Sequence, residues 1–418
     1  MLDRLRRWAP IAFGAVLFSS VADVAHADEI NSGDTAWMLT SSALVLLMTL
    51  PGLALFYGGL VRGRNVLSVF MQCLISAGMA GLVWVLVGYS LAFGEGNQFI
   101  GDFSMLGLNG ITADSVSGTI PTYVFVVFQG MFAIITPALM LGAFAERMKF
   151  SAYLAFITIW LLVVYAPLAH MVWGGGLISS WGAVDFAGGL VVHMSSGFSA
   201  LAAAIFIGKR RGYGTHAMPP HNLPFTVIGA ALLWVGWFGF NAGSELAADG
   251  IAGLAFLTTN TATATAVLVW VAIEWFRHGK PTVLGGATAA VAGLVAITPA
   301  CANVTPIGAM GVGAGAAILC YLAVAILKPK MGYDDSLDVF GVHGIGGAWG
   351  AIAVALLGSG ATLMVQLQSV IFTAIFAPVM TVIILFVLKL FMGSLSVDEE
   401  EEAEGLDLSL HSENAYSE

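Results

Sequence analysis

The chain has 418 residues, of which 58% are hydrophobic and only 10% are charged, and it contains 51 glycines. An ordinary soluble domain carries roughly 25% charged residues, so this composition excludes the soluble globular class and indicates an integral membrane protein. The formal net charge is −10.

The first 27 residues differ from the rest and are typical of a secretory signal peptide. A basic start, "MLDRLRRW", precedes the apolar stretch "APIAFGAVLF" and the small-residue pattern "AHA" that ends at Ala27. We therefore expect a removed signal peptide at 1–27. The alternative is an uncleaved first helix, although Asp23 interrupts it. Sequencing the N-terminus of the mature protein would decide between Asp28 and Met1.

The basic residues predict how often the remaining chain crosses the membrane. A crossing helix needs about 20 apolar residues, and after residue 27 Lys and Arg occur only in a few clusters. Each interval between clusters holds two apolar segments, and the positive-inside rule places the clusters in the cytoplasm. The sequence thus predicts an all-α membrane protein of eleven helices, N-terminus out and C-terminus in. The predicted spans are 36–60, 66–93, 122–145, 151–172, 186–208, 225–243, 251–276, 282–300, 309–328, 339–358 and 366–393.

The expected organisation is a transport domain over 28–393 and an acidic cytoplasmic tail over 394–418. Nine acidic residues and no Lys or Arg lie between Asp398 and Glu418, and the run "DEEEEAEG" is expected to be a solvated, mobile segment. The odd number of cysteines, three, indicates packing residues and neither a disulfide framework nor a metal site.

Two pairs of similar segments predict an internal repeat. "VVHMSSGFSALAAAI" around His193 and "GVHGIGGAWGAIAVA" around His343 share Val-His followed by Gly four residues later. "GLALFYGG" from Gly52 and "GWFGFNAG" from Gly236 share Phe at the fifth position and Gly at the eighth. The pairs fall in spans 1 and 6 and in spans 5 and 10. Because a unit of five spans is odd, the second copy must be inverted, as in many transporters.

The two histidines are then expected to face each other near the middle of the membrane. A lone histidine in a span is often a core side chain bonded to a neighbouring helix, but two related ones indicate a pathway. No charged residue lies mid-span to pair with them, apart from Glu274 near a cytoplasmic end. Burial without a counter-ion favours neutral imidazoles.

Several longer stretches carry a resemblance to a known family. "PGLALFYGGLVRGRN", "FQGMFAIITPAL", "AHMVWGGGLISSWGAVDFAGG", "PPHNLP", "GWFGFNAGS", "DVFGVHG" and "EGLDLSLHSENAYSE" resemble the ammonium transporter, methylammonium permease and Rhesus protein family. The resemblance covers residues 34–418 and is nearer to the bacterial ammonium transporters than to the Rhesus proteins. Gly130, where a Met is common, and the loop "SELAADG" depart from the family pattern.

The resemblance implies a role for eight residues. Phe128, Trp173 and Ser244 would form a periplasmic recruitment site for ammonium. Phe132 and Phe240 would form a stacked phenyl gate, and His193 and His343 the twin pore histidines. Asp185 would be the acidic residue that orders the vestibule at the start of span 5. Without the resemblance, Phe132 and Phe240 would be ordinary packing rings, Trp173 an aromatic-belt anchor and Asp185 a helix N-cap. His170 is expected to be structural.

The implied activity is ammonium transport, in which ammonium loses its proton and neutral ammonia crosses a dry, histidine-lined pore. A passive channel for ammonia or carbon dioxide, and an ammonium sensor that signals through the tail, are alternatives. The family also implies a homotrimer in the inner (plasma) membrane and a cytoplasmic PII-type partner. We expect no cofactor, no metal, no nucleic-acid partner and no enzymatic activity, because no nucleophile with a base and no phosphate loop occurs in the sequence.

Overall fold

A computed structural model describes residues 29–416, so the predicted signal peptide at 1–27 lies outside the described residues. Ten helices in this part of the chain are long and apolar enough to cross a membrane. They are Ser32–Leu60, Gly63–Phe93, Thr122–Phe144, Phe150–Ser180, Gly189–Ile207, Leu223–Glu245, Gly250–His278, Pro306–Met331, Phe340–Leu357 and Leu363–Met392. The chain is thus a multi-pass, all-α membrane protein.

The predicted span 282–300 is the exception. It coincides with α13 (Val283–Ile297), which has 15 residues. At 1.5 Å per residue such a helix rises about 22 Å, less than the roughly 30 Å of a bilayer core. The number of eleven spans therefore remains a prediction.

Most of these long helices contain more than one element. The first comprises α1 (Ser32–Leu47), η1 (Met48–Leu53) and α2 (Ala54–Leu60), and the second η2 (Gly63–Asn65), α3 (Val66–Val83), η3 (Trp84–Gly88) and α4 (Tyr89–Phe93). The third comprises α5 (Thr122–Leu139) and α6 (Leu141–Phe144), and the fourth α7 (Phe150–Trp160), η5 (Leu161–Tyr165), α8 (Ala166–Trp173) and α9 (Leu177–Ser180). The fifth comprises η6 (Gly189–Met194) and α10 (Ser195–Ile207).

The second half of the chain is built in the same way. It contains α11 (Leu223–Ala242) with η7 (Gly243–Glu245), α12 (Gly250–His278), α13, and α14 (Pro306–Leu322) with η8 (Ala323–Leu327) and α15 (Lys328–Met331). Then follow η9 (Phe340–Gly344) with α16 (Ile345–Leu357), α17 (Leu363–Met392), α18 (Glu399–Glu404) and α19 (Leu406–His411). The remaining elements are η4 (Leu106–Leu108) and the short strands β1 (Val116–Ser117) and β2 (Ile120–Pro121), which pair antiparallel.

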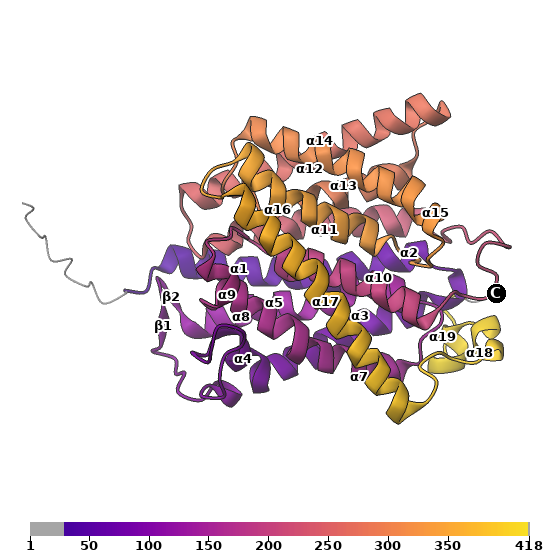
Figure 1. Cartoon of the computed structure of the whole chain (residues 1–418), viewed down its shortest axis with the longest axis horizontal. Coiled ribbons are helices and arrows are strands. Elements are labelled where there is room, and N and C mark those ends of the chain that lie inside the picture. Colours follow the sequence, from indigo (N-terminus) through magenta and orange to yellow (C-terminus); the bar gives the residue numbers. More distant parts are fainter. Residues whose placement is uncertain (1–28, 417–418) are drawn as a thin grey trace, which may run out of the picture.

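Figure 1 shows the long helices running side by side between two ends of a bundle. One end carries β1 and β2, which we call the outer end; the opposite end carries α15, α18 and α19, which we call the inner end. α17 crosses the bundle and packs against α10 and α16. α12 packs against α13 and α14, and α1 packs against α11.

Glycines let the two histidine-bearing helices touch at the centre of the bundle. A Cβ atom added to Gly197 of α10 would overlap the backbone of Gly344, and one added to Gly347 of α16 would lie 2.8 Å from the carbonyl oxygen of Gly189. Each helix therefore packs its glycine against the wide π-helical turn of the other. π-Helical turns are generally rare and occur often at functional sites; residues 29–416 contain six of them, and the two that carry the histidines are η6 and η9.

The run "DEEEEAEG" from Asp398 is predicted to be a solvated, mobile segment; its acidic side chains are exposed or partly exposed, but the run is helical and not irregular. Residues 399–404 form α18, whose N-terminus is closed by a capping box between Asp398 and Glu401. α19 docks on α3: the Leu406 N–H donates to Asn65 Oδ1, and Asp407 Oδ1 accepts the Ser68 N–H at 2.7 Å. These contacts order the tail because the start of α3 offers free backbone N–H groups.

Candidate functional site

Aromatic and imidazole rings form an unbroken series from the outer part of the bundle to its centre. The ring of Phe132 lies 5.0 Å from Phe128, 6.0 Å from Trp173 and 4.2 Å from Phe240, measured between centroids. Phe240 lies 5.9 Å from His193, whose ring is 5.3 Å from that of His343. Residues from five separate segments thus form one series of neighbouring rings.

The two histidines lie in the π-helical turns η6 and η9 and are both buried. Their Nδ1 atoms are 3.2 Å apart, which is hydrogen-bonding distance. Trp237 stacks on His193 at 5.4 Å with an interplanar angle of 24°. The hydrogen bond and the stacking therefore hold the two imidazole rings edge to edge at a fixed spacing.

Asp185 connects the outer aromatic residues to the histidines. Its Oδ1 accepts the N–H groups of Gly188 and Gly189, and its Oδ2 accepts those of Leu190 and Val191. These are the free N–H groups at the start of η6, so Asp185 caps the turn that carries His193. The carbonyl oxygen of Asp185 also accepts the indole N–H of Trp173 at 2.9 Å. One residue thereby positions Trp173 and His193.

Ser244 lies partly buried in η7, directly after α11, and its hydroxyl donates to the Phe240 carbonyl oxygen at 2.8 Å. Its neighbour Gly243 is close to the ring of Phe128, since an added Cβ would lie 2.9 Å from Phe128 Cε2. The hydroxyl oxygen keeps lone pairs that can accept a further N–H.

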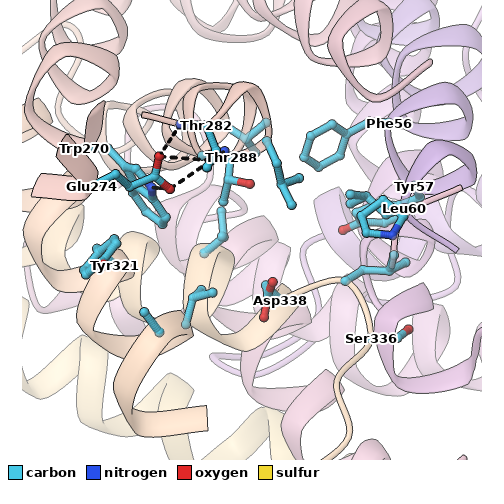
Figure 2. Close-up of a pocket in the computed structure, with 18 of the residues that line it drawn as sticks. Phe56, Tyr57, Leu60, Trp270, Glu274, Thr282, Thr288, Tyr321, Ser336 and Asp338 are labelled. Atoms are coloured by element: carbon cyan, nitrogen blue, oxygen red, sulfur yellow. Dashed lines mark hydrogen bonds between the residues drawn. The ribbon is translucent and has the colours of Figure 1, made fainter. Parts of the chain in front are cut away.

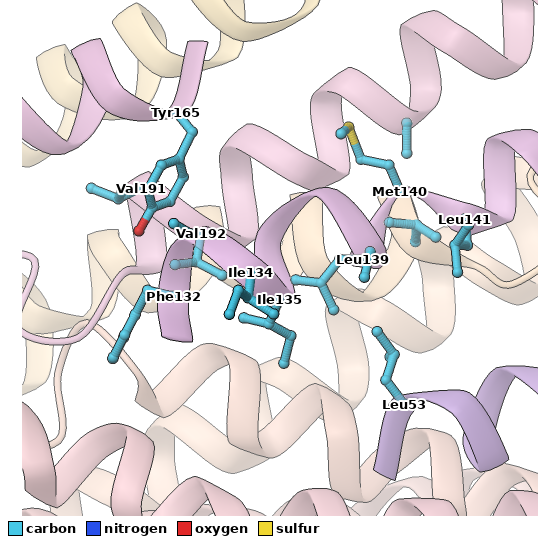
Figure 3. Close-up of a cluster of buried hydrophobic side chains, with 14 of the residues drawn as sticks. Leu53, Phe132, Ile134, Ile135, Leu139, Met140, Leu141, Tyr165, Val191 and Val192 are labelled. Carbon is cyan, nitrogen blue, oxygen red and sulfur yellow. The ribbon is translucent and has the colours of Figure 1, made fainter. Parts of the chain in front are cut away.

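The space beside the histidines is narrow and apolar. A cavity of about 10 Å³ is lined by Met48, Leu53, Phe56, Ile135, Leu139, Val192, His193, Leu233, Trp237, Phe240, Val291 and His343. This is about the volume that a single water needs. Figure 3 shows four of these lining residues, Leu53, Ile135, Leu139 and Val192, among other buried hydrophobic side chains. No charged side chain belongs to the lining, so the histidines and Trp237 supply its polar groups.

A wider cavity of about 360 Å³ lies on the inner side of His343, which lines both cavities. Figure 2 shows Phe56 and Tyr57 on one side of it and Trp270, Tyr321 and Glu274 on the other. Glu274 accepts the backbone N–H and the hydroxyl of Thr282 at the start of α13, and the Trp270 indole N–H. The carboxylate is thus occupied by capping α13.

The comparisons with known proteins agree with one another. The model of the Ammonium Transporter Family matches residues 36–416. An ammonium transporter of Bacillus subtilis (strain 168) is 48% identical over 93% of this chain and 99% of its own length. One of Aquifex aeolicus (strain VF5) is 44% identical over 97% of this chain and 99% of its own. The chain belongs to the ammonium transporter family.

Solved structures of this family have the same fold. The structure titled "Sensor Amt Protein" superimposes with a TM-score of 0.85 at 29% identity, covering 90% of this chain and 98% of its own. Candida albicans Mep2 superimposes with a TM-score of 0.84 at 35% identity over 89% and 88% of the two chains. Membership of a transporter family implies that the chain is not an enzyme. No group of three or more His, Cys, Asp or Glu side chains within residues 29–416 could hold a metal ion.

Sequence reasoning missed three residues of the site. Asp335 is the counterpart of Asp185, because it precedes His343 by eight residues, as Asp185 precedes His193, and its Oδ2 accepts the Phe340 N–H that opens η9. This equal spacing between aspartate and histidine is a signal in the sequence that could have revealed Asp335. Trp237 and Thr298 contact His193. Trp237 stood in the quoted segment "GWFGFNAG", whereas nothing in the sequence distinguishes Thr298.

A buried ionic cluster closes the inner end. Arg210 binds Glu146 Oε2 at 2.9 Å and Asp334 Oδ1 at 2.8 Å, Arg62 binds Glu146 at 2.7 Å, and Arg147 binds Asp334 at 3.0 Å. Burial raises the pKa of the Glu146 carboxyl, but Arg210 and Arg62 outweigh burial and leave this pKa below its ordinary value. Arg210 and Arg147 lower the pKa of Asp334 in the same way against the effect of burial.

Proposed function

We propose that the chain recruits ammonium at Phe128, Trp173 and Ser244, removes its proton and conducts ammonia past Phe132, Phe240 and the two histidines. The observation that carries the proposal is the unbroken series of rings that ends in a narrow, uncharged cavity at the histidines. A pore without counter-charge rejects an ion unless that ion can lose its charge.

The outer end favours arrival of a cation. The segments that connect helices there contain Glu95, Asp102, Asp114 and Asp249, and no Lys or Arg occurs in 94–121, 173–188 or 243–250. An acidic entrance raises the local concentration of cations and their rate of arrival. The faces of Trp173 and Phe128 then stabilise a small cation by roughly 0.5 to 2 kcal/mol, and the Ser244 oxygen can accept an N–H.

The dry pore supplies the selectivity. Burial lowers the pKa of an ammonium-type group by up to about 3 to 5 from a lysine-like value near 10.4, so deprotonation becomes accessible at neutral pH. Potassium has no proton to release and meets the full cost of dehydration. Ammonia passes the Phe132–Phe240 gate, and the histidine pair relays the proton as one coupled unit.

The same proposal includes the inverted repeat. It is supported by the matching pairs η6 with α10 and η9 with α16, in which both π-helical turns are followed by α-helices of 13 residues. Asp185 and Asp335 add a second pair with the same spacing to a histidine. With α13 as a span, the chain would have five plus five helices and α17 as the eleventh, the N-terminus out and the C-terminus in.

Reconstitution of the purified protein in liposomes tests the proposed function. An ammonium gradient should drive a current through the wild type, and His193→Leu with His343→Leu should abolish it, whereas the exposed His216→Leu should not. Unchanged current in the double variant would refute the relay. A passive gas channel would give ammonia flux without any current, so the same experiment separates the two candidates.

A sensor role that acts through the tail is the second candidate. It is favoured by the contacts of α18 and α19 with the inner end, where Arg211 N–H donates to Glu402 and His221 Nε2 lies 2.8 Å from the Tyr416 hydroxyl. We expect a PII-type signal protein to bind this surface and block transport, and a homotrimer in the inner membrane. Pull-downs across nucleotide and 2-oxoglutarate conditions, and the mass of the purified protein in lipid, check both expectations.

A further inference from the structure

Thr298 closes the C-terminus of α13 next to His193 and is fully buried. The backbone N–H of Thr298 donates to the carbonyl oxygen of Val295 and not to that of Leu294, four residues before it. The Leu294 carbonyl oxygen instead accepts a hydrogen bond from the Thr298 hydroxyl at 2.8 Å. The indole N–H of Trp237 donates to the same hydroxyl oxygen at 2.9 Å. A hydroxyl has one proton and two lone pairs, so one lone pair remains.

The remaining lone pair of the Thr298 hydroxyl determines which ring nitrogen of His193 carries the hydrogen. Nε2 of His193 lies 3.3 Å from Thr298 Oγ1. The hydroxyl proton is already donated to Leu294 O, a buried helix-end carbonyl that would otherwise lose its hydrogen bond. Nε2 therefore carries a hydrogen and donates it to Thr298. A neutral imidazole has one N–H, so Nδ1 of His193 is an acceptor.

The assignment extends to the second histidine. His193 Nδ1 faces His343 Nδ1 at 3.2 Å. Since the first nitrogen is an acceptor, the second must be the donor, and His343 keeps its lone pair on Nε2. His343 also borders the 360 Å³ cavity on the inner side. The hydrogen bonds therefore run in one direction, from His343 through His193 to Thr298.

We propose that Thr298 is the positioning residue that fixes the tautomers of both histidines, with hydrogen on Nε2 of His193 and on Nδ1 of His343. Trp237 occupies one lone pair of the Thr298 hydroxyl and so helps to hold the hydroxyl in place, but Trp237 does not determine the tautomers. This inference deepens the proposed relay and rests on it only for its consequence for transport.

The consequence is that the described state is the end of an inward relay. In such a relay, a proton from ammonium bonds to His193 Nε2, the Nδ1 proton of His193 passes to His343 Nδ1, and the Nε2 proton of His343 leaves to water in the wide cavity. Afterwards His193 carries hydrogen on Nε2 and His343 on Nδ1, as the contacts require. The next cycle must first break the bond between His193 and Thr298.

The test is nitrogen NMR of ¹⁵N-histidine-labelled protein in lipid nanodiscs. Coupling across the shared hydrogen bond identifies the two Nδ1 atoms. In the wild type and in Thr298→Ser we expect a protonated Nε2 on His193 and a protonated Nδ1 on His343. Thr298→Val removes one neutral hydrogen bond, so the tautomer ratio should fall about five-fold, toward a mixture.

Trp237→Phe is the matched control, because it removes a donor to Thr298 but leaves the bond to Leu294 O; the wild-type tautomers should persist. A wild type with hydrogen mainly on His193 Nδ1, or a folded Thr298→Val with unchanged tautomers, would overturn the inference. If Thr298→Val does not fold, the wild-type and Thr298→Ser spectra still decide. If the wild type gave no ammonium-driven current in liposomes, the proposed function would fail, but the measurement of the tautomers would be unaffected.

Discussion

Replacing Asp185 by Asn should destabilise the protein more than the same change at its counterpart Asp335. Both Asp185 oxygens accept two N–H groups each. An amide presents one oxygen and one NH₂ group, so two of these bonds are lost. A hydrogen bond to a charged group contributes about 1.5 to 3 kcal/mol, and the expected loss is therefore about 3 to 6 kcal/mol.

Asp335 provides the matched comparison because it is buried at the equivalent place in the second half. Its Oδ2 accepts the Phe340 N–H at 2.8 Å, whereas its Oδ1 has no hydrogen-bond partner among the described residues. In Asp335→Asn the NH₂ group can take the position of Oδ1 and the bond to Phe340 persists. The expected loss is about 1 kcal/mol, the difference between a charged and a neutral acceptor.

The measurement is the free energy of unfolding in mixed micelles, followed by tryptophan fluorescence, with ammonium current in liposomes beside it. Asp185→Asn should also weaken the current, because the cap positions His193 and the Asp185 carbonyl holds Trp173. Equal destabilisation by the two substitutions would refute the reasoning, since the difference follows from the number of N–H groups that each carboxylate accepts.

The other predictions concern charge, pH and packing. Arg210→Met should cost about 3 kcal/mol, the low end of the cost of breaking a buried ion pair, because it removes one arginine partner from each of the buried carboxylates Glu146 and Asp334, while Arg62 and Arg147 stay. The exposed Arg211→Met should change the unfolding free energy by less than about 0.5 kcal/mol; similar losses in the two variants would contradict the cluster. Because the pKa values of Glu146 and Asp334 are lowered in the fold, their contribution is present above about pH 4 and is lost as pH falls through the folded values. Unfolding temperatures measured down to pH 3 should therefore drop in the wild type and less in Arg210→Met. Gly197→Ala should destabilise by about 1 to 3 kcal/mol or more, because its Cβ would overlap Gly344, whereas Gly253→Ala, with open space around it, should not; an equally stable Gly197→Ala would exclude the close helix crossing.

The sequence predicted the positions of the helices well because apolar length and the clusters of Lys and Arg report directly on a bilayer. It placed His193 and His343 opposite each other from a repeat of a few residues, and the 3.2 Å contact confirms this. The roles in transport remain predictions for all eight residues: Phe128, Trp173, Ser244, Phe132, Phe240, His193, His343 and Asp185.

Other features depend on three-dimensional contacts that no local pattern encodes. Thr298 reaches the site because α13 ends beside His193, 105 residues away in the chain. The resemblance implied that the end of the tail contacts the cytoplasmic face, and α19 does contact α3 through Asp407. The helix α18 was missed because an acidic run is normally solvated and mobile. Asp335 could have been found by extending the repeat eight residues upstream of His343.

The meeting of the two halves of the chain has a consequence for biosynthesis. Phe132 and His193 precede the loop at 208–222, whereas Phe240 and His343 follow it, so each half supplies one ring to the Phe132–Phe240 pair and one to the imidazole pair. While the ribosome is still making the later helices, the inserted earlier ones enclose no conduit. Under the proposed function, the pore therefore forms only once the helices that carry Phe240 and His343 have been inserted beside those that carry Phe132 and His193.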